Sequence, residues 1–232
     1  MSGSPFWRPV LCGSIHSEFE TILTLNKTKE NNFMKKTALF ITTAAIIAAL
    51  YVVLTFLANS LGLASQAIQV RFSESLTILA LFTPAAIPGL FIGCLLSNIL
   101  IGSIIQDVIF GSLTTLAAAA LTYIIGLAFR KLIQKAEAKK TKTGLGIAGT
   151  VLGSLPPIMG NMLVVPLVLI YAYGFTDPVS FLGFDFNSVT AIYWFYVVTV
   201  GIGELISCTV LGLLVSFLFR KTGLDLKIRI DK

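Results

Sequence analysis

Long apolar runs separated by short polar segments form the main pattern of this sequence. A transmembrane helix needs about 20 apolar residues, whereas the strands of a membrane β-barrel alternate apolar and polar residues in segments of about ten. The chain shows the runs and no such alternation. The pattern therefore predicts an all-α integral membrane protein with six transmembrane helices, at residues 37–58, 75–83, 84–103, 108–129, 145–173 and 189–219.

Composition and charge support the same class. Hydrophobic residues make up 56% of the chain and charged residues 12%, which is typical of membrane proteins. The net charge of +6 does not indicate nucleic-acid binding, because the basic residues flank the apolar runs, at Lys35, Lys36 and within 130–142 and 220–229. By the positive-inside rule, six crossings place both termini in the cytoplasm. Residues 174–188 then lie outside, either as a lid or as a solvated connector.

Residues 1–33 are polar and mixed, and we interpret them as a leader before a membrane domain at residues 34–232. Met34 is followed by two lysines and the first apolar run, which fits a native start. This run is too long for the roughly 7 to 15 residue core of a cleaved signal peptide. We therefore expect it to remain as the first transmembrane helix.

Motifs for catalysis or metal binding are scarce. The sequence has no G-x-x-x-x-G-K-[ST] phosphate loop and no H-E-x-x-H pair, and Cys12, Cys94 and Cys208 form no C-x-x-C pair. A phosphate loop is what an energising nucleotide site of its own would require. We therefore expect no enzyme activity, no metal centre and no cofactor.

Polar residues within the apolar segments mark the candidate site. The stretch 69–111 carries four of them, Arg71, Glu74, Asn98 and Asp107. An unpaired charge in hydrocarbon costs a few kcal/mol or more, so such residues usually face a partner, a cavity or a ligand. The run at 75–83 rises only about 14 Å, so the chain before it enters at membrane depth, where irregular backbone must be buried or line a wet cavity. Arg71 and Glu74 are expected to line such a cavity, open to the outside, or else to form an ion pair.

Counting helix rise from the basic ends places further polar residues at a common depth. Four residues form one layer about 21 to 24 Å from these ends: Asn98, Thr114, Asn161 and Glu204. Asp107 comes out at about 34 Å, near the outer mouth. Glu204 is expected to contact a ligand, with Arg71 as the alternative partner. Asn161 follows two prolines that disrupt its helix and free backbone carbonyls beside its amide.

The first apolar run carries small residues four apart, Ala44 with Ala48 and Ala45 with Ala49. Small residues at this spacing let a second helix approach closely. The alanines form either an internal packing face or a docking face for another membrane subunit.

Five stretches carry a resemblance to a known family: AALYVVLTFLA, IQVRFSESLTILALFTPAAIPGLFIGCLLSNI, DVIFGSLTTLAA, LPPIMGNMLVVP and VGIGELISC. They resemble the queuosine-precursor transporter (QueT) family, substrate-binding S components of energy-coupling factor (ECF) importers. The resemblance covers most of the chain from Met34 onward. It implies a six-helix protein of the bacterial cell membrane with an outward-facing pocket for a deazapurine such as preQ1. It also implies three partners, a membrane coupling protein that docks on the alanine face and two ATPases.

The chemistry of a deazaguanine fits the polar residues. Its N–H edge suits a carboxylate, its carbonyl suits an Asn amide or an Arg, and the ammonium of its aminomethyl form suits a second carboxylate. We therefore assign substrate binding to Arg71, Glu74, Asn161 and Glu204, with Asn98 and Asp107 as secondary contacts or mouth residues.

Two other functions fit the same residues. The first is a self-sufficient proton- or cation-coupled carrier, in which Glu204 and Asp107 bind the coupling ion. The second is a membrane scaffold whose polar residues only pair internally. A carrier needs no ATPase partners, and a scaffold predicts no saturable binding of a small molecule.

Overall fold

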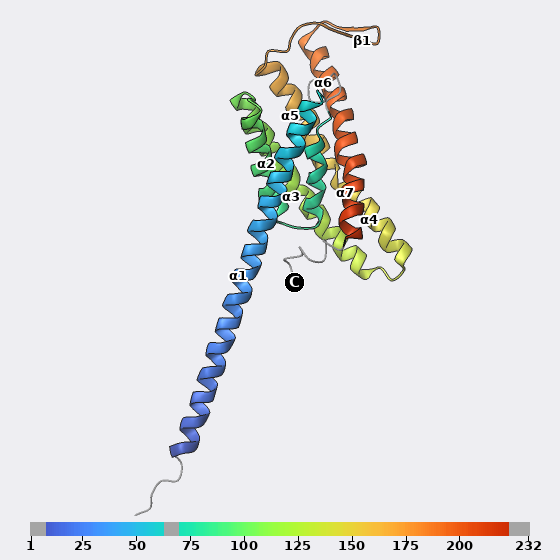
Figure 1. Cartoon of the computed structure of the whole chain (residues 1–232). Coiled ribbons are helices and arrows are strands. Elements are labelled where there is room, and N and C mark those ends of the chain that lie inside the picture. The colour runs from blue at the N-terminus through green and yellow to red at the C-terminus, as the bar shows by residue number, and fades with distance from the viewer. Residues whose placement is uncertain (1–7, 63–69, 223–232) are drawn as a thin grey trace, which may run out of the picture. The chain divides into compact units, whose positions relative to one another are not determined.

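The computed structural model describes the backbone of residues 8–62 and 70–222, and side chains from residue 33 onward (Figure 1). The chain divides into two compact units, Met1–Phe40 and Ile41–Lys232. Helix α1 (Arg8–Ser60) begins in the first unit and ends in the second. The leader predicted at residues 1–33 is therefore helical from Arg8 onward, and its role as a leader stays a prediction.

Four stretches of helix in the described residues are long and apolar enough to cross a membrane, at 28 to 33 residues each. They are Phe33–Ser60 of α1; α3 (Ile105–Lys135); α4 (Lys139–Gly153) with α5 (Leu155–Tyr171); and α6 (Val189–Glu204) with η2 (Leu205–Leu211) and α7 (Gly212–Lys221). The chain is thus an all-α integral membrane protein. Two further apolar helices, η1 (Phe72–Leu81) and α2 (Ala86–Leu100), are shorter. The count of six crossings stays a prediction.

Helix η1 is a 3₁₀ helix in the centre of the bundle, in contact with α2, α3, α4, α7 and η2. The hydroxyls of Ser75 and Thr77 donate to the carbonyls three residues earlier, Phe72 O and Glu74 O, at 2.6 Å each. Ten residues at the 3₁₀ rise span about 20 Å, less than the ~30 Å hydrocarbon core. The structure thus confirms a short second helix, and nine of its ten residues are buried.

The helix that holds Asn161 is interrupted at Ser154, as its prolines predict. Pro157 has no N–H, so the carbonyl of Gly153, four residues earlier, loses its helical donor. The Thr122 hydroxyl of α3 donates to this carbonyl instead, at 2.8 Å. The freed Gly153 carbonyl therefore ties α3 to the break between α4 and α5.

The small-residue faces of α1 and α2 pack against each other. A Cβ atom at Gly89 would lie 2.7 Å from Ala44 O, and one at Gly93 would lie 3.1 Å from Ala48 Cα. Ala44 and Ala48 are accordingly buried in internal packing, one of the two alternatives for the alanine face. Ala45 and Ala49, one position further along the helix, are exposed, and docking through them stays a prediction.

This close approach predicts a loss of stability for Gly93→Ala. The new Cβ would lie 2.7 Å from Tyr51 Cβ, whereas a Cβ at Gly201 would meet nothing closer than 3.7 Å. Both changes add the same methyl group to a helix. The difference between their free energies of unfolding therefore measures the cost of overpacking, which is about 1–3 kcal/mol. Thermal unfolding in detergent should show a lower midpoint for Gly93→Ala than for Gly201→Ala. Equal midpoints would contradict the packing.

The segment between α5 and α6 contains a short antiparallel hairpin, β1 (Val179–Phe181) and β2 (Phe184–Phe186). Leu182 and Gly183 both adopt positive φ at its turn, as a two-residue type I′ turn requires. The rings of Phe181 and Phe186 lie 5.6 and 5.1 Å from that of Phe195 on α6. The hairpin is thus attached to α6, and whether it acts as a lid or as a connector stays open.

Candidate functional site

Two buried carboxylates meet in the centre of the bundle. Glu74 comes from η1 and Glu204 from the last residue of α6, and they are 1% and 2% exposed. A carboxylate oxygen of each and the thiol sulfur of Cys208 lie within 4.8 Å of one another. Two carboxylates so close in a water-poor interior repel each other unless a proton or a cation lies between them.

The two carboxylates differ in how their oxygens are satisfied. Glu204 accepts from Asn161 Nδ2 at 3.0 Å on one oxygen and from the Cys208 thiol at 3.2 Å on the other. Glu74 accepts from the Tyr51 hydroxyl on Oε1 at 2.5 Å, while its buried Oε2 has no hydrogen-bond partner in the described part of the chain. A buried polar atom without a partner is rare in folded proteins and often marks a place for a ligand, an ion or a water. Glu74 Oε2 is thus the acceptor most open to a ligand.

A change of helix type positions Glu204 and Cys208. The π helix η2 begins directly after Glu204 and contains Cys208. π turns in otherwise α-helical segments are uncommon and recur at functional sites. Here the wider turn carries the thiol to both carboxylate residues, since Cys208 Sγ also lies 3.7 Å from the Glu74 carbonyl oxygen.

A small cavity of about 40 Å³ brings together the other predicted residues. Arg71, Asn98 and Asp107 line it, together with Tyr51. Asp107 Oδ2 also accepts from the Tyr173 hydroxyl at 3.3 Å. The volume is near the ~30 Å³ that one water occupies in the liquid. Counting helix rise placed Asp107 well above Asn98. In the structure both side chains line the same cavity, so this difference in depth is not observed.

Arg71 is the cation of this site. Its guanidinium lies within electrostatic range of Asp107, Glu204 and Glu74. Among the described residues, however, it forms no direct ion pair with them. The two alternatives in which Arg71 pairs directly with Glu74 or with Glu204 are thus not what the structure contains.

Tyr51 connects the carboxylate pair to the cavity, because it lines the cavity and donates to Glu74. We call the following set the polar site: Tyr51, Arg71, Glu74, Asn98, Asp107, Asn161, Glu204 and Cys208. Sequence reasoning missed Tyr51 and Cys208. The sequence did contain a signal for Tyr51. Ala44, Ala48 and Tyr51 stand at positions i, i+4 and i+7, a spacing that places all three on the same face of the helix.

Thr114 does not belong to the polar site. It faces a separate apolar groove between α3 and α5. Its neighbour Thr115 points inward instead and donates to Cys94 Sγ at 3.5 Å. The predicted common height holds for Thr114, because a Cβ at Gly160, next to Asn161, would lie 2.8 Å from Thr114 Cγ2. Its side chain faces the groove, however, and does not converge with Asn161 and Glu204, which are hydrogen-bonded to each other.

Glu74, Glu204 and Cys208 are also the described residues that could hold a metal ion together. Carboxylate and thiolate ligands in this number suit zinc better than magnesium or calcium. The expectation of no metal centre stays a prediction.

A model of one protein family, described as the QueT transporter, matches residues 41–221. The chain belongs to the QueT family. The match includes every residue of the polar site and ends with α7, at Lys221. No curated protein and no solved structure matches the chain. Membership in QueT identifies a multi-pass membrane transporter of the queuosine-precursor family with a small-molecule substrate.

Proposed function

We propose that this QueT protein is the substrate-binding S component of an ECF importer and that it binds a cationic deazaguanine, preQ1. The observation that carries the proposal is the buried Glu74 Oε2, which has no hydrogen-bond partner among the described residues and lies beside a second carboxylate. A donor-rich cation satisfies both features at once, because its ammonium supplies three N–H groups and one positive charge.

The charge of the polar site favours a cation. It contains three carboxylates, Glu74, Asp107 and Glu204, and one guanidinium, Arg71. In a low-dielectric interior this excess of negative charge disfavours an anionic ligand and favours an ammonium. Precursors without the aminomethyl group lack that charge, which supports preQ1 over neutral deazaguanines.

The bonding pattern assigns different parts of the ligand to the two glutamates. Both oxygens of Glu204 already accept one hydrogen bond, so the orientation of this carboxylate is fixed. A fixed carboxylate suits the paired N–H groups at the edge of a planar base. Glu74 with its open oxygen suits the ammonium. Asn161 and Arg71 are left to donate to the ring carbonyl.

Binding of a bicyclic base requires the cavity to widen, because about 40 Å³ accommodates little more than one water. The cavity walls come from α1, η1, α2 and the start of α3. A shift of η1 away from α1 would enlarge the space beside Glu74. The long 3₁₀ helix fits such a movement, since this geometry is strained beyond a few residues.

The proposed partners are a membrane coupling protein and two ATPases. The chain has no phosphate loop that would let it use ATP alone. Ala45 and Ala49 present an exposed small-residue face on α1 where a partner helix could approach closely. In this proposal the chain crosses the membrane six times, and both termini are cytoplasmic, because the basic segments then share one side.

The alternative of a self-sufficient cation-coupled carrier is favoured by one observation, the closeness of the Glu74 and Glu204 carboxylates. Such a pair could hold a coupling cation as well as a substrate ammonium. Uptake distinguishes the two functions. A carrier moves substrate alone, whereas an S component needs its partners.

We therefore expect labelled preQ1 to accumulate in cells only when this chain is produced together with the coupling protein and both ATPases. Ala45→Trp should reduce uptake by about fivefold or more while leaving preQ1 binding to the purified chain intact, since a bulky ring at a close helix contact costs about 1–3 kcal/mol. Val53→Trp, also exposed on α1, is the matched control. Uptake without the partners would contradict the S-component proposal.

A further inference from the structure

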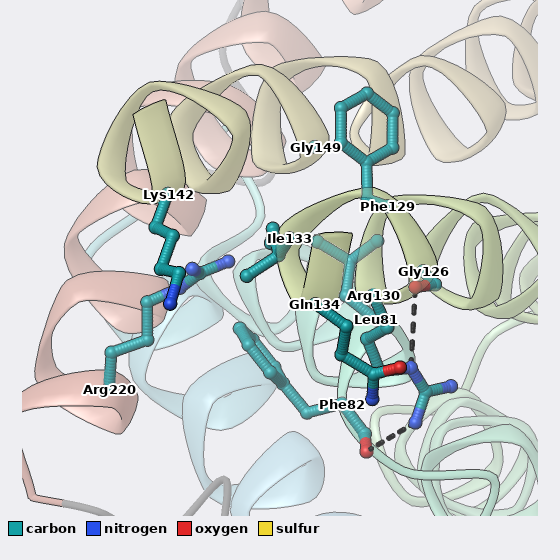
Figure 2. Close-up of a pocket in the computed structure, with 10 residues that line it drawn as sticks. All are labelled: Leu81, Phe82, Gly126, Phe129, Arg130, Ile133, Gln134, Lys142, Gly149 and Arg220. Atoms are coloured by element: carbon teal, nitrogen blue, oxygen red, sulfur yellow. Dashed lines mark hydrogen bonds between the residues drawn. The ribbon is translucent and has the colours of Figure 1, made fainter. Parts of the chain in front are cut away.

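A second pocket, of about 260 Å³, lies at the end of the bundle where basic residues gather (Figure 2). Three cations line it from three helices, Arg130 of α3, Lys142 of α4 and Arg220 of α7. Figure 2 shows Lys142 and Arg220 on one side and Arg130 with Gln134 on the other. None of the described residues lining this pocket carries a carboxylate.

Backbone contacts hold the two arginines on the pocket walls. Arg130 Nε donates to Gly126 O at 3.3 Å, and its Nη1 donates to Phe82 O at 3.4 Å. Arg220 Nη2 donates to Gly146 O at 3.3 Å, and its guanidinium lies 5.2 Å from the centre of the Phe82 ring. Guanidinium and ammonium groups are the donors that phosphate oxygens accept from in proteins.

An apolar groove with a volume of about 910 Å³ is lined mainly by α3 and α5. One wall runs from Phe129 to Phe110 of α3, a rise of about 28 Å, close to the hydrocarbon thickness. Phe129 lines both the pocket and the groove. The basic pocket and the apolar groove therefore adjoin at Phe129, with the cations on one side of this residue and a long apolar wall on the other.

We propose that the pocket and the groove together bind one anionic phospholipid, with the phosphate in the pocket of Arg130, Lys142 and Arg220 and an acyl chain in the groove between α3 and α5. Basic pockets between transmembrane helices at the membrane interface recognise anionic headgroups. A free phosphate would use the pocket alone and leave the groove without a role. The site is separate from the polar site and does not depend on the identity of the transported substrate.

The test is lipid binding by the whole purified chain, measured by native mass spectrometry during titration with phosphatidylglycerol or phosphatidylcholine. Phosphatidylglycerol is expected to bind at least about tenfold more tightly. Lys142→Gln and Arg220→Gln should each weaken it about fivefold, which corresponds to about 1 kcal/mol per basic residue. Lys140→Gln removes the same charge from the same helix outside the pocket and should have no effect.

A variant in the groove tests whether the bound molecule is a lipid or a free anion. Ala117→Phe fills the groove, whereas Val198→Phe changes an exposed residue of α6. Only Ala117→Phe should weaken phosphatidylglycerol binding. Equal affinity for both lipids, an equal loss in Lys140→Gln, or displacement by inorganic phosphate with no effect of Ala117→Phe would each overturn the proposal. Lys142 is exposed, so its variant keeps the test valid if Arg220→Gln does not fold.

Discussion

Replacing Glu204 by glutamine should abolish high-affinity binding of preQ1. The glutamine keeps the size of the side chain but removes the charge that the N–H edge of the base requires. It also replaces an acceptor oxygen with an NH₂ group that faces a donor, Asn161 Nδ2 or the Cys208 thiol. Loss of a buried, hydrogen-bonded charge partner costs about 2–5 kcal/mol, or roughly 30- to 4,000-fold in affinity.

Isothermal titration calorimetry on the full chain in detergent measures this loss. Glu137→Gln is the matched control, because it makes the same chemical change at an exposed position outside the polar site. Asn161→Ala should lose less affinity than Glu204→Gln, since it removes a neutral amide. A folded Glu204→Gln protein that binds preQ1 like the wild type would contradict the assignment of the ring edge to Glu204.

Sequence reasoning reached the class of the protein because the bilayer imposes simple rules. Runs of apolar residues must form helices there, and polar residues inside them need a reason. This logic identified Glu74, Asn161 and Glu204, which the structure brings together in one buried cluster. It found a short second helix from its length alone, although the 3₁₀ geometry of η1 was not predictable from the pattern.

Estimating depth from helix rise failed where the direction and the length of the side chain decide which residues meet. The count gives the height of a Cα atom along an upright helix and says nothing about which way the side chain points. Thr114 and Thr115 differ by one residue, about 100° of rotation, and only Thr115 faces inward. Asn98 and Asp107 differ in estimated height, but a Cβ at Gly111 would lie 3.3 Å from Asn98 Nδ2 and 3.6 Å from Asp107 Oδ1.

Tyr51 and Cys208 were not predicted as members of the polar site for a different reason. Tyrosine and cysteine are common in apolar helices, where packing alone explains them. Their role at the polar site depends on a hydroxyl and a thiol that reach carboxylates on other turns or helices. Such contacts depend on how η1 is inserted between α1 and η2, which no local pattern in the sequence specifies.

Replacing Glu74 by glutamine should lower the affinity for preQ1 far more than the affinity for a neutral analogue. In the proposed arrangement the open Oε2 of Glu74 binds the ammonium of preQ1, whereas the rest of the base is bound by other residues. Glu74→Gln is therefore expected to lower the affinity for preQ1 about 100-fold and the affinity for a neutral nitrile analogue less than about fivefold. The larger loss corresponds to about 2.7 kcal/mol, within the range for truncating a buried charge pair.

Calorimetric titration with both ligands tests this difference, with Tyr51→Phe as the companion variant. Tyr51→Phe removes the donor to Glu74 Oε1 but keeps the carboxylate, so it should weaken preQ1 binding less than Glu74→Gln does. An equal loss for both ligands in Glu74→Gln would mean that Glu74 contacts the ring rather than the ammonium. If Glu204→Gln instead lowered the affinity for preQ1 much more than the affinity for the nitrile, the roles of the two carboxylates would be exchanged. The ammonium would then lie beside the Glu204 oxygens, which accept hydrogen bonds from Asn161 and Cys208.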